Sequence, residues 1–144
     1  MLFRSPANMQ VFAALAPFLA RGDRAGFDAS PTAALLAREA PDNLSSLRKF
    51  FERPDKAVRS KLIAAISGDG PGVTEGLARA LKVPALVLGN AMDWIHPLAC
   101  ARQIAATIAG ARFAEIAPKA QDKARHAAEF QAALRGFLLE GARI

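Results

Sequence analysis

The pattern of apolar and polar positions changes once along the chain, near Val83. Before that point, capping residues and prolines divide the sequence into short helical stretches. Ser30 precedes Pro31, the usual order at a helix start, and Gly22 is placed to end the first helix. These signals predict an all-helical block over residues 1–81.

The remaining residues, 82–144, predict strands that alternate with helices. VPALVLG, at residues 83–89, is a continuous apolar run, too short for a helix and without the alternation of a half-exposed strand, so we expect a buried parallel strand. A helix over 97–109 and a second strand over 112–116 follow. A closing helix at 123–139 should bury four apolar side chains: Phe130, Leu134, Phe137 and Leu138. The predicted fold class is α/β, with an N-terminal helical block followed by a parallel βαβα segment.

One glycine-rich stretch, SGDGPG at residues 67–72, interrupts the helical pattern. Its glycines lack the spacing of a phosphate-binding loop, because Val73 stands where a third glycine would be needed. We interpret the stretch as a flexible connection or a domain boundary. Thr74 then caps a short helix that ends near Leu81.

The composition places further limits on the protein. A chain of 144 residues with 52% hydrophobic residues can bury a core, which argues against disordered and fibrous classes. No apolar run approaches the roughly 18–20 residues of a membrane-spanning helix. Cys100 is the single cysteine, so the chain has no intramolecular disulfide and no cysteine pair for zinc. We therefore expect a cytoplasmic protein without a membrane span, a metal or a cofactor.

Candidate chemistry lies in the segments that follow the two predicted strands. Asp93, within GNAMDWIHP, comes directly after the first strand, at the sheet edge where open α/β sheets collect catalytic groups. His126 comes after the second strand and ahead of an apolar helix. Met92 and Trp94 flank Asp93 and would line a pocket or fill the core, and Phe12 of the helical block is a third pocket candidate.

The segment VPALVLGNAMDWIHP resembles the penultimate strand and acid loop of the α/β-hydrolases. In that family a proline-led apolar strand runs to a glycine, then to a catalytic aspartate, then to a proline that opens the next helix. The resemblance covers residues 83–137, and the helical block looks like the cap that many members carry, with residues 1–4 as the end of the preceding strand. It implies that Asp93 orients His126, which takes a proton from a serine during cleavage of a small ester or similar acyl compound.

The serine that this mechanism needs has no source in the sequence. No GxSxG elbow occurs, and the segment that would form the oxyanion hole is also missing. The resemblance therefore implies a truncated hydrolase, inactive by itself toward simple esters. The absent strands also predict exposed apolar surface, and hence self-association or a complementing N-terminal half as partner.

Structural roles remain open for both candidate residues. Asp93 could cap the helix that begins near Pro97. His126 falls on one helical face with Phe130 and Phe137, so it could be a core histidine. His96 and Cys100 could meet on a helix, but two ligands do not make a zinc site.

A different class of function starts from the net charge of +6. The chain could be a non-catalytic basic helical module that binds a protein or a nucleic acid through its densest basic run. This run contains Arg48, Lys49, Arg53, Lys56, Arg59 and Lys61. Phe50 and Phe51 look like core residues and Pro54 breaks the helix, so a solvated face is the better interpretation and nucleic acid is not expected as a partner.

Overall fold

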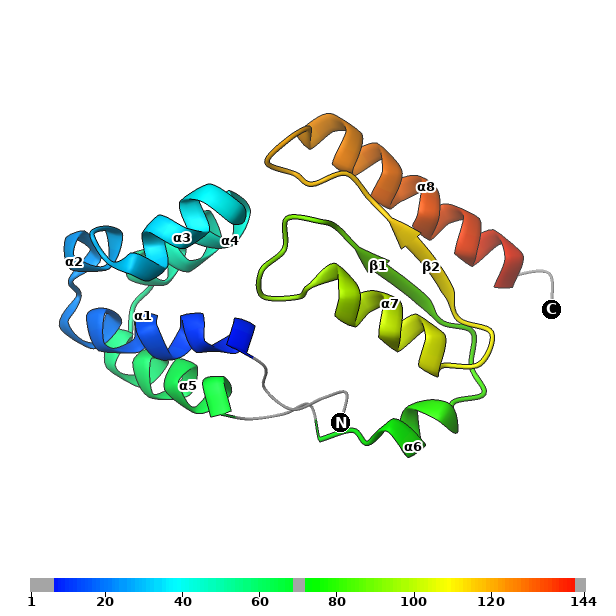
Figure 1. The fold of residues 1–144 in the computed structure, drawn as a ribbon, viewed down its shortest axis with the longest axis horizontal. Coiled ribbons are helices and arrows are strands. Elements are labelled where there is room, and N and C mark those ends of the chain that lie inside the picture. Colours follow the sequence, from blue (N-terminus) through cyan, green and yellow to red (C-terminus); the bar gives the residue numbers. More distant parts are fainter. Residues whose placement is uncertain (1–6, 69–71, 142–144) are drawn as a thin grey trace. The chain divides into compact units, whose positions relative to one another are not determined.

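The computed structural model describes residues 7–68 and 72–141. They form two compact units, each described here by itself (Figure 1). The division falls at the glycine-rich stretch, and α6 (Glu75–Arg79) groups with the strands, whereas the sequence pattern groups residues up to 81 with the helical block. The strand end expected at residues 1–4 lies outside the described residues.

The first unit is helical throughout. It contains η1 (Ala7–Met9), α1 (Gln10–Arg21), α2 (Arg24–Asp28), α3 (Pro31–Glu39), α4 (Pro41–Arg48), η2 (Lys49–Glu52) and α5 (Lys56–Gly68). Gly22 ends α1 in the left-handed region, with φ of 67°. The Ser30 hydroxyl accepts the Ala33 N–H at 3.2 Å, and Pro31 is the first residue of α3. The helix boundaries predicted at these residues are confirmed.

The core of this unit lies between α1 and its helical neighbours. Its largest fully buried side chains are Phe27, Leu15, Leu19, Leu36 and Leu47. The Phe27 ring lies 6.1 Å from that of Phe18 and 5.9 Å from that of Phe51, measured between centroids. Truncating such a buried phenylalanine to alanine usually costs about 3–5 kcal/mol. The helical unit therefore has its own hydrophobic core.

The second unit contains a parallel pair of strands. Its elements are α6, β1 (Leu86–Gly89), α7 (Leu98–Thr107), β2 (Arg112–Glu115) and α8 (Lys123–Gly141). β1 and β2 are paired in parallel, with Leu86 opposite Arg112 and Gly89 opposite Glu115. α7 connects the strands and packs on both of them, and α8 packs on β1. The parallel strand–helix–strand unit expected from the sequence is present.

Close packing of α7 fixes the end of β1. A Cβ atom at Gly89 would lie 3.0 Å from Ala101 Cβ and 3.0 Å from Leu98 Cδ1, so a larger residue would force the strand and helix apart. Arg102 of α7 donates to Glu115 of β2 at 2.6 Å. The loop that leaves β1 therefore starts from a well-anchored position.

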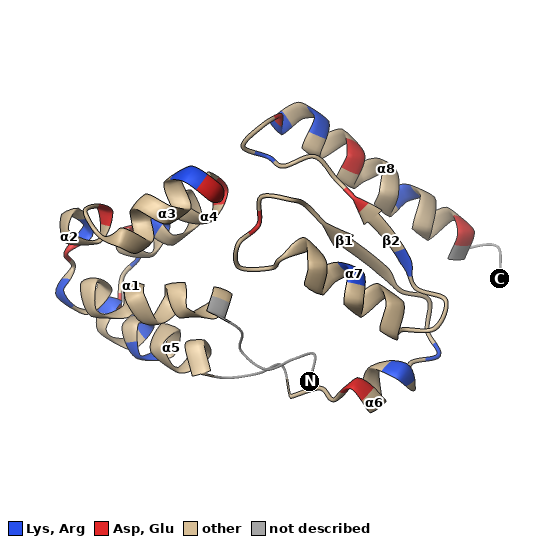
Figure 2. Cartoon of the chain, in the orientation of Figure 1, with Lys and Arg blue, Asp and Glu red and all other residues tan. Residues whose placement is uncertain are grey.

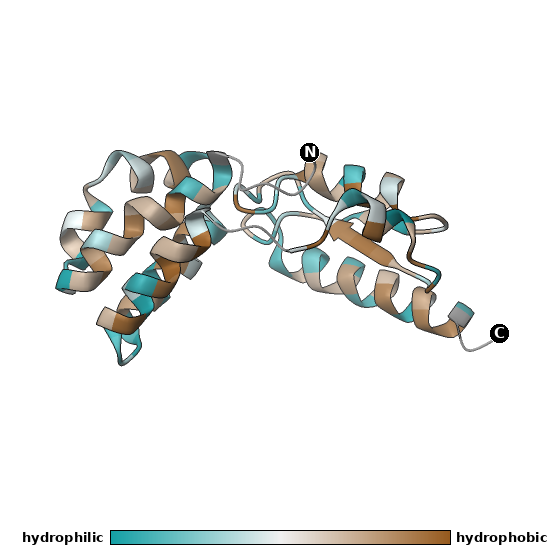
Figure 3. Ribbon diagram, turned by 90° about the horizontal axis from the view of Figure 1, so that it is seen from below, coloured by the Kyte–Doolittle hydropathy of each residue, from teal (hydrophilic) through white to brown (hydrophobic). Residues whose placement is uncertain are grey.

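Two expectations about burial in this unit are wrong. β1 is half-buried rather than buried, and α8 does not bury its apolar stripe. Phe130, Leu134 and Leu138 are 42%, 38% and 59% exposed, and Figure 3 shows apolar positions along this helix. The reason is that a two-stranded sheet offers too little apolar surface to cover both faces of a strand and a 19-residue helix.

None of the helices among the described residues has the length and apolar character needed to cross a membrane.

Candidate active site at the carboxyl edge of the strands

Two loops leave the sheet at the same edge, because β1 and β2 are parallel (Figure 1). Residues 90–97 follow β1, and residues 116–122 follow β2. Asp93 lies in the first loop, and His126 lies in the first turn of α8, directly beyond the second loop. This is the edge at which open α/β sheets bind ligands and place catalytic groups.

Side chains of the first loop hold its backbone in place. The Asn90 side-chain oxygen accepts the Met92 N–H at 3.0 Å, and Asp93 Oδ1 accepts the His96 N–H at 2.9 Å. Ile95, within the second of these turns, is buried. At the loop end, the Pro97 carbonyl accepts the Cys100 N–H at 2.8 Å and starts α7. The loop is therefore ordered by local hydrogen bonds and one apolar anchor.

Asp93 also contacts the imidazole ring of His96. Its Oδ2 lies 3.2 Å from His96 Nδ1, with the aspartate side chain 23% exposed and the histidine side chain 80% exposed. The hydrogen bond to Asp93 raises the pKa of His96, the negative charge of Asp93 adds to this, and partial burial opposes it. From the sequence, His96 is a candidate only for a metal ligand with Cys100. The sequence signal for the contact with Asp93 is the spacing of an aspartate and a histidine three residues apart in a strand-end loop.

The second loop holds its histidine through the backbone. His126 Nδ1 lies 2.7 Å from the Ala117 carbonyl oxygen, and Glu129 accepts the Ala117 N–H at 2.6 Å. Glu129 also accepts from Arg125 Nε at 2.6 Å, and these two hydrogen bonds lower the pKa of Glu129. Both polar groups of Ala117 are thus held by side chains of α8.

These contacts define the tautomers of both rings. A carbonyl or carboxylate oxygen can only accept, so the neutral forms of His126 and His96 carry hydrogen on Nδ1 and a lone pair on Nε2. A general base needs such a lone pair. Either histidine could therefore accept a proton at this edge.

The sequence-predicted site residues are divided between the two units. The contacts above join Asp93 to His96 and His126 to Ala117, so pairing of Asp93 with His126 stays a prediction. Met92 and Trp94 are half-buried in the first loop, and Phe12 is half-buried on α1 of the helical unit. Their role as pocket residues is also still a prediction.

A metal site is not formed by the side chains of residues 7–68 and 72–141, where no three His, Cys, Asp or Glu residues gather. Cys100 is half-buried on α7.

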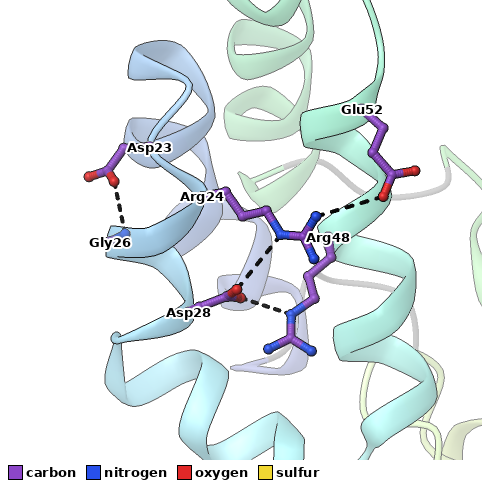
Figure 4. A network of polar contacts seen from close by, with 6 residues as sticks. All are labelled: Asp23, Arg24, Gly26, Asp28, Arg48 and Glu52. Atoms are coloured by element: carbon purple, nitrogen blue, oxygen red, sulfur yellow. Dashed lines mark hydrogen bonds and ion pairs between the residues drawn. The ribbon is translucent and has the colours of Figure 1, made fainter.

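The basic run of the helical unit contacts acidic side chains. Arg48 Nε donates to Asp28 Oδ1 at 2.8 Å (Figure 4). Arg24 pairs with the same aspartate at 3.7 Å and with Glu52 at 3.9 Å. Figure 2 shows acidic and basic residues along the same helices. A binding role for this run stays a prediction, and charge compensation at Arg48 weakens it.

Comparison with known proteins supports the fold. No protein-family model and no curated protein matches the sequence. Among solved structures, the chain is similar to the enol-lactonase from Burkholderia xenovorans LB400, with 28% identity over 90% of this chain and a TM-score of 0.55. The chain spans about half of that structure, 50% of its length. Together with the parallel strands, this similarity supports an α/β-hydrolase-like fragment.

Proposed function

We propose that this chain supplies the cap and the acid-and-histidine edge of an α/β-hydrolase that cleaves an ester or a lactone. The observation that carries the proposal is the parallel pairing of β1 and β2. Because of it, the loop that contains Asp93 and the loop before His126 begin at the same edge of the sheet. The similarity to an enol-lactonase supports a cyclic ester as one form of the substrate. In this proposal the chain corresponds to the C-terminal part of such a hydrolase, and its helical unit to the cap.

The proposed reaction uses a serine, a histidine and Asp93. The serine oxygen attacks the carbonyl carbon while its proton passes to the histidine; the bond from that carbon to the leaving oxygen breaks, and the leaving oxygen takes the proton. Water, deprotonated by the same histidine, then attacks the acyl-serine and releases the acid and the serine hydroxyl. Asp93 stabilises the imidazolium that forms between these steps. The sequence-based candidate for the histidine is His126, whose Nδ1–H bond to Ala117 leaves Nε2 in the required form.

The serine must come from a segment that this sequence does not contain, because no GxSxG elbow is present. Surface features support a complementing segment. Among residues 72–141, β1 pairs only with β2. Apolar side chains of this unit are also exposed, among them Val83 ahead of β1 and Leu138 in α8. A partner segment with further parallel strands would cover them, and a second copy of the chain is the alternative partner.

Complementation tests the proposal. The chain is co-expressed with the part of the enol-lactonase that it does not match, and hydrolysis of p-nitrophenyl acetate and of an enol-lactone is measured. We expect turnover from the complex and none from either part alone, with loss of turnover in an Asp93→Ala complex. A stable complex without turnover would contradict the proposal, and so would failure of the two parts to associate.

A further inference from the structure

Both carboxylate oxygens of Asp93 contact His96. Oδ1 accepts the His96 backbone N–H at 2.9 Å, and Oδ2 lies 3.2 Å from Nδ1 of the ring. The first bond orders the loop and the second orients the imidazole. The same carboxylate thus accepts from the backbone of His96 and contacts its ring.

The His96 side chain is far more exposed than that of its partner Asp93. The carboxylate is largely covered while the imidazole is 80% exposed, so the nitrogen opposite Asp93 lies on an accessible ring. A base that must meet a serine from another segment needs such access. The His126 ring, in contrast, is half-buried, and its Nδ1–H bonds to a neutral carbonyl. A neutral acceptor fixes the tautomer but stabilises an imidazolium less than a carboxylate does.

We propose that His96, held by Asp93, is the proton acceptor of the hydrolase, and that His126 is a structural residue of the loop after β2. This inference rests on the proposed function and assigns its proton acceptor to His96 in place of His126. His96 Nε2 takes the proton of the serine hydroxyl as the serine oxygen bonds to the carbonyl carbon. The same proton then passes to the alkoxide that leaves, which restores the neutral ring. Asp93 is the positioning residue for His96.

The experiment must distinguish two roles of Asp93: capping the loop alone, or positioning His96 for proton transfer. Asparagine at position 93 keeps a side-chain oxygen for the His96 N–H but removes the negative charge. Alanine removes both. A residue that only caps the loop would tolerate Asp93→Asn, whereas the acid–base pair would not. Backbone amide spectra of each variant show whether the loop retains its structure.

The first measurement is an NMR titration of the full chain, which has only two histidines. Signals are assigned with His96→Gln and His126→Gln. We expect the pKa of His96 to lie above its ordinary value of 6.5 and to fall toward that value in Asp93→Asn. A His96 titration that does not respond to Asp93→Asn overturns the inference.

The second measurement uses the complemented hydrolase described above. His96→Gln should lower kcat by about 10²–10⁴-fold with little change in KM, a larger loss than His126→Gln causes. If His126→Gln abolishes turnover and His96→Gln does not, the inference fails while the proposed function stands. If no complex turns over substrate, the proposed function fails and the catalytic assignment of His96 fails with it.

Discussion

The loop after β1 and the loop after β2 leave the same sheet edge but hold their histidines with different partners. In the first, the Asp93 carboxylate contacts His96, whose ring remains exposed. In the second, the Ala117 carbonyl contacts His126. The carboxylate makes protonation of the ring easier and leaves it accessible, whereas the carbonyl ties a helix to a loop. This difference in partners is the basis of the chemical role proposed for His96 and the structural role proposed for His126.

The largest effect is expected where the first loop is anchored. Gly89→Val adds a side chain against Ala101 and Leu98, which overpacks the contact between β1 and α7. We expect the free energy of unfolding to fall by about 1–3 kcal/mol, measured by urea denaturation. Gly76→Ala is the matched control, because a Cβ there meets no atom closer than 3.8 Å and alanine favours the helix. Equal losses in the two variants would refute the packing argument.

A smaller effect separates the two histidines. His126→Ala removes the bond to Ala117 and should lower the free energy of unfolding by about 0.5–1.5 kcal/mol. His96→Ala removes an exposed ring, and we expect a change within about 0.5 kcal/mol. Thermal and urea denaturation of both variants provide the measurement. A larger loss for His96→Ala would reverse the roles assigned to the two loops.

The smallest effect concerns the pH dependence of the Asp93–His96 pair. The pKa of His96 is raised in the folded chain, so the pair stabilises the fold fully below pH 6.5, and this contribution is lost as the pH rises through the folded pKa. For so exposed a pair we expect about 0.2–0.5 kcal/mol. The difference in urea stability between the wild-type chain and Asp93→Asn should therefore shrink from pH 5.5 to 8.5. A stability difference between the two chains that grows with pH would contradict this prediction.

Local signals in the sequence predict much of this fold. Gly22, Ser30 and Thr74 mark helix ends through their own backbone preferences and side-chain oxygens, and the structure uses each of them in that way. The apolar run that ends at Gly89 predicts the first strand. The helix after Pro97 connects it to the second strand, and this order predicts that the two strands are parallel. These features depend on neighbouring residues alone.

Burial could not be predicted in the same way. The exposure of Phe130 and Leu138 depends on how many strands lie beneath α8, which the sequence of the helix does not encode. The contact of His126 with Ala117 depends on the turn at residues 118–122 that separates them. The Asp93–His96 contact spans only three residues and could have been predicted from their spacing. The family resemblance instead implies a pairing with His126, which lies further along the sequence.

Each strand-end loop holds its own histidine through Nδ1. A long-range ¹H–¹⁵N correlation spectrum of the full chain at pH 8.5 reports which ring nitrogen carries the hydrogen in each neutral imidazole. We predict hydrogen on Nδ1 in both His96 and His126, and loss of that preference in His96 alone when Asp93 is replaced by alanine. Hydrogen on Nε2 of His96 in the wild-type chain, or a His96 tautomer that does not change in Asp93→Ala, would contradict the account.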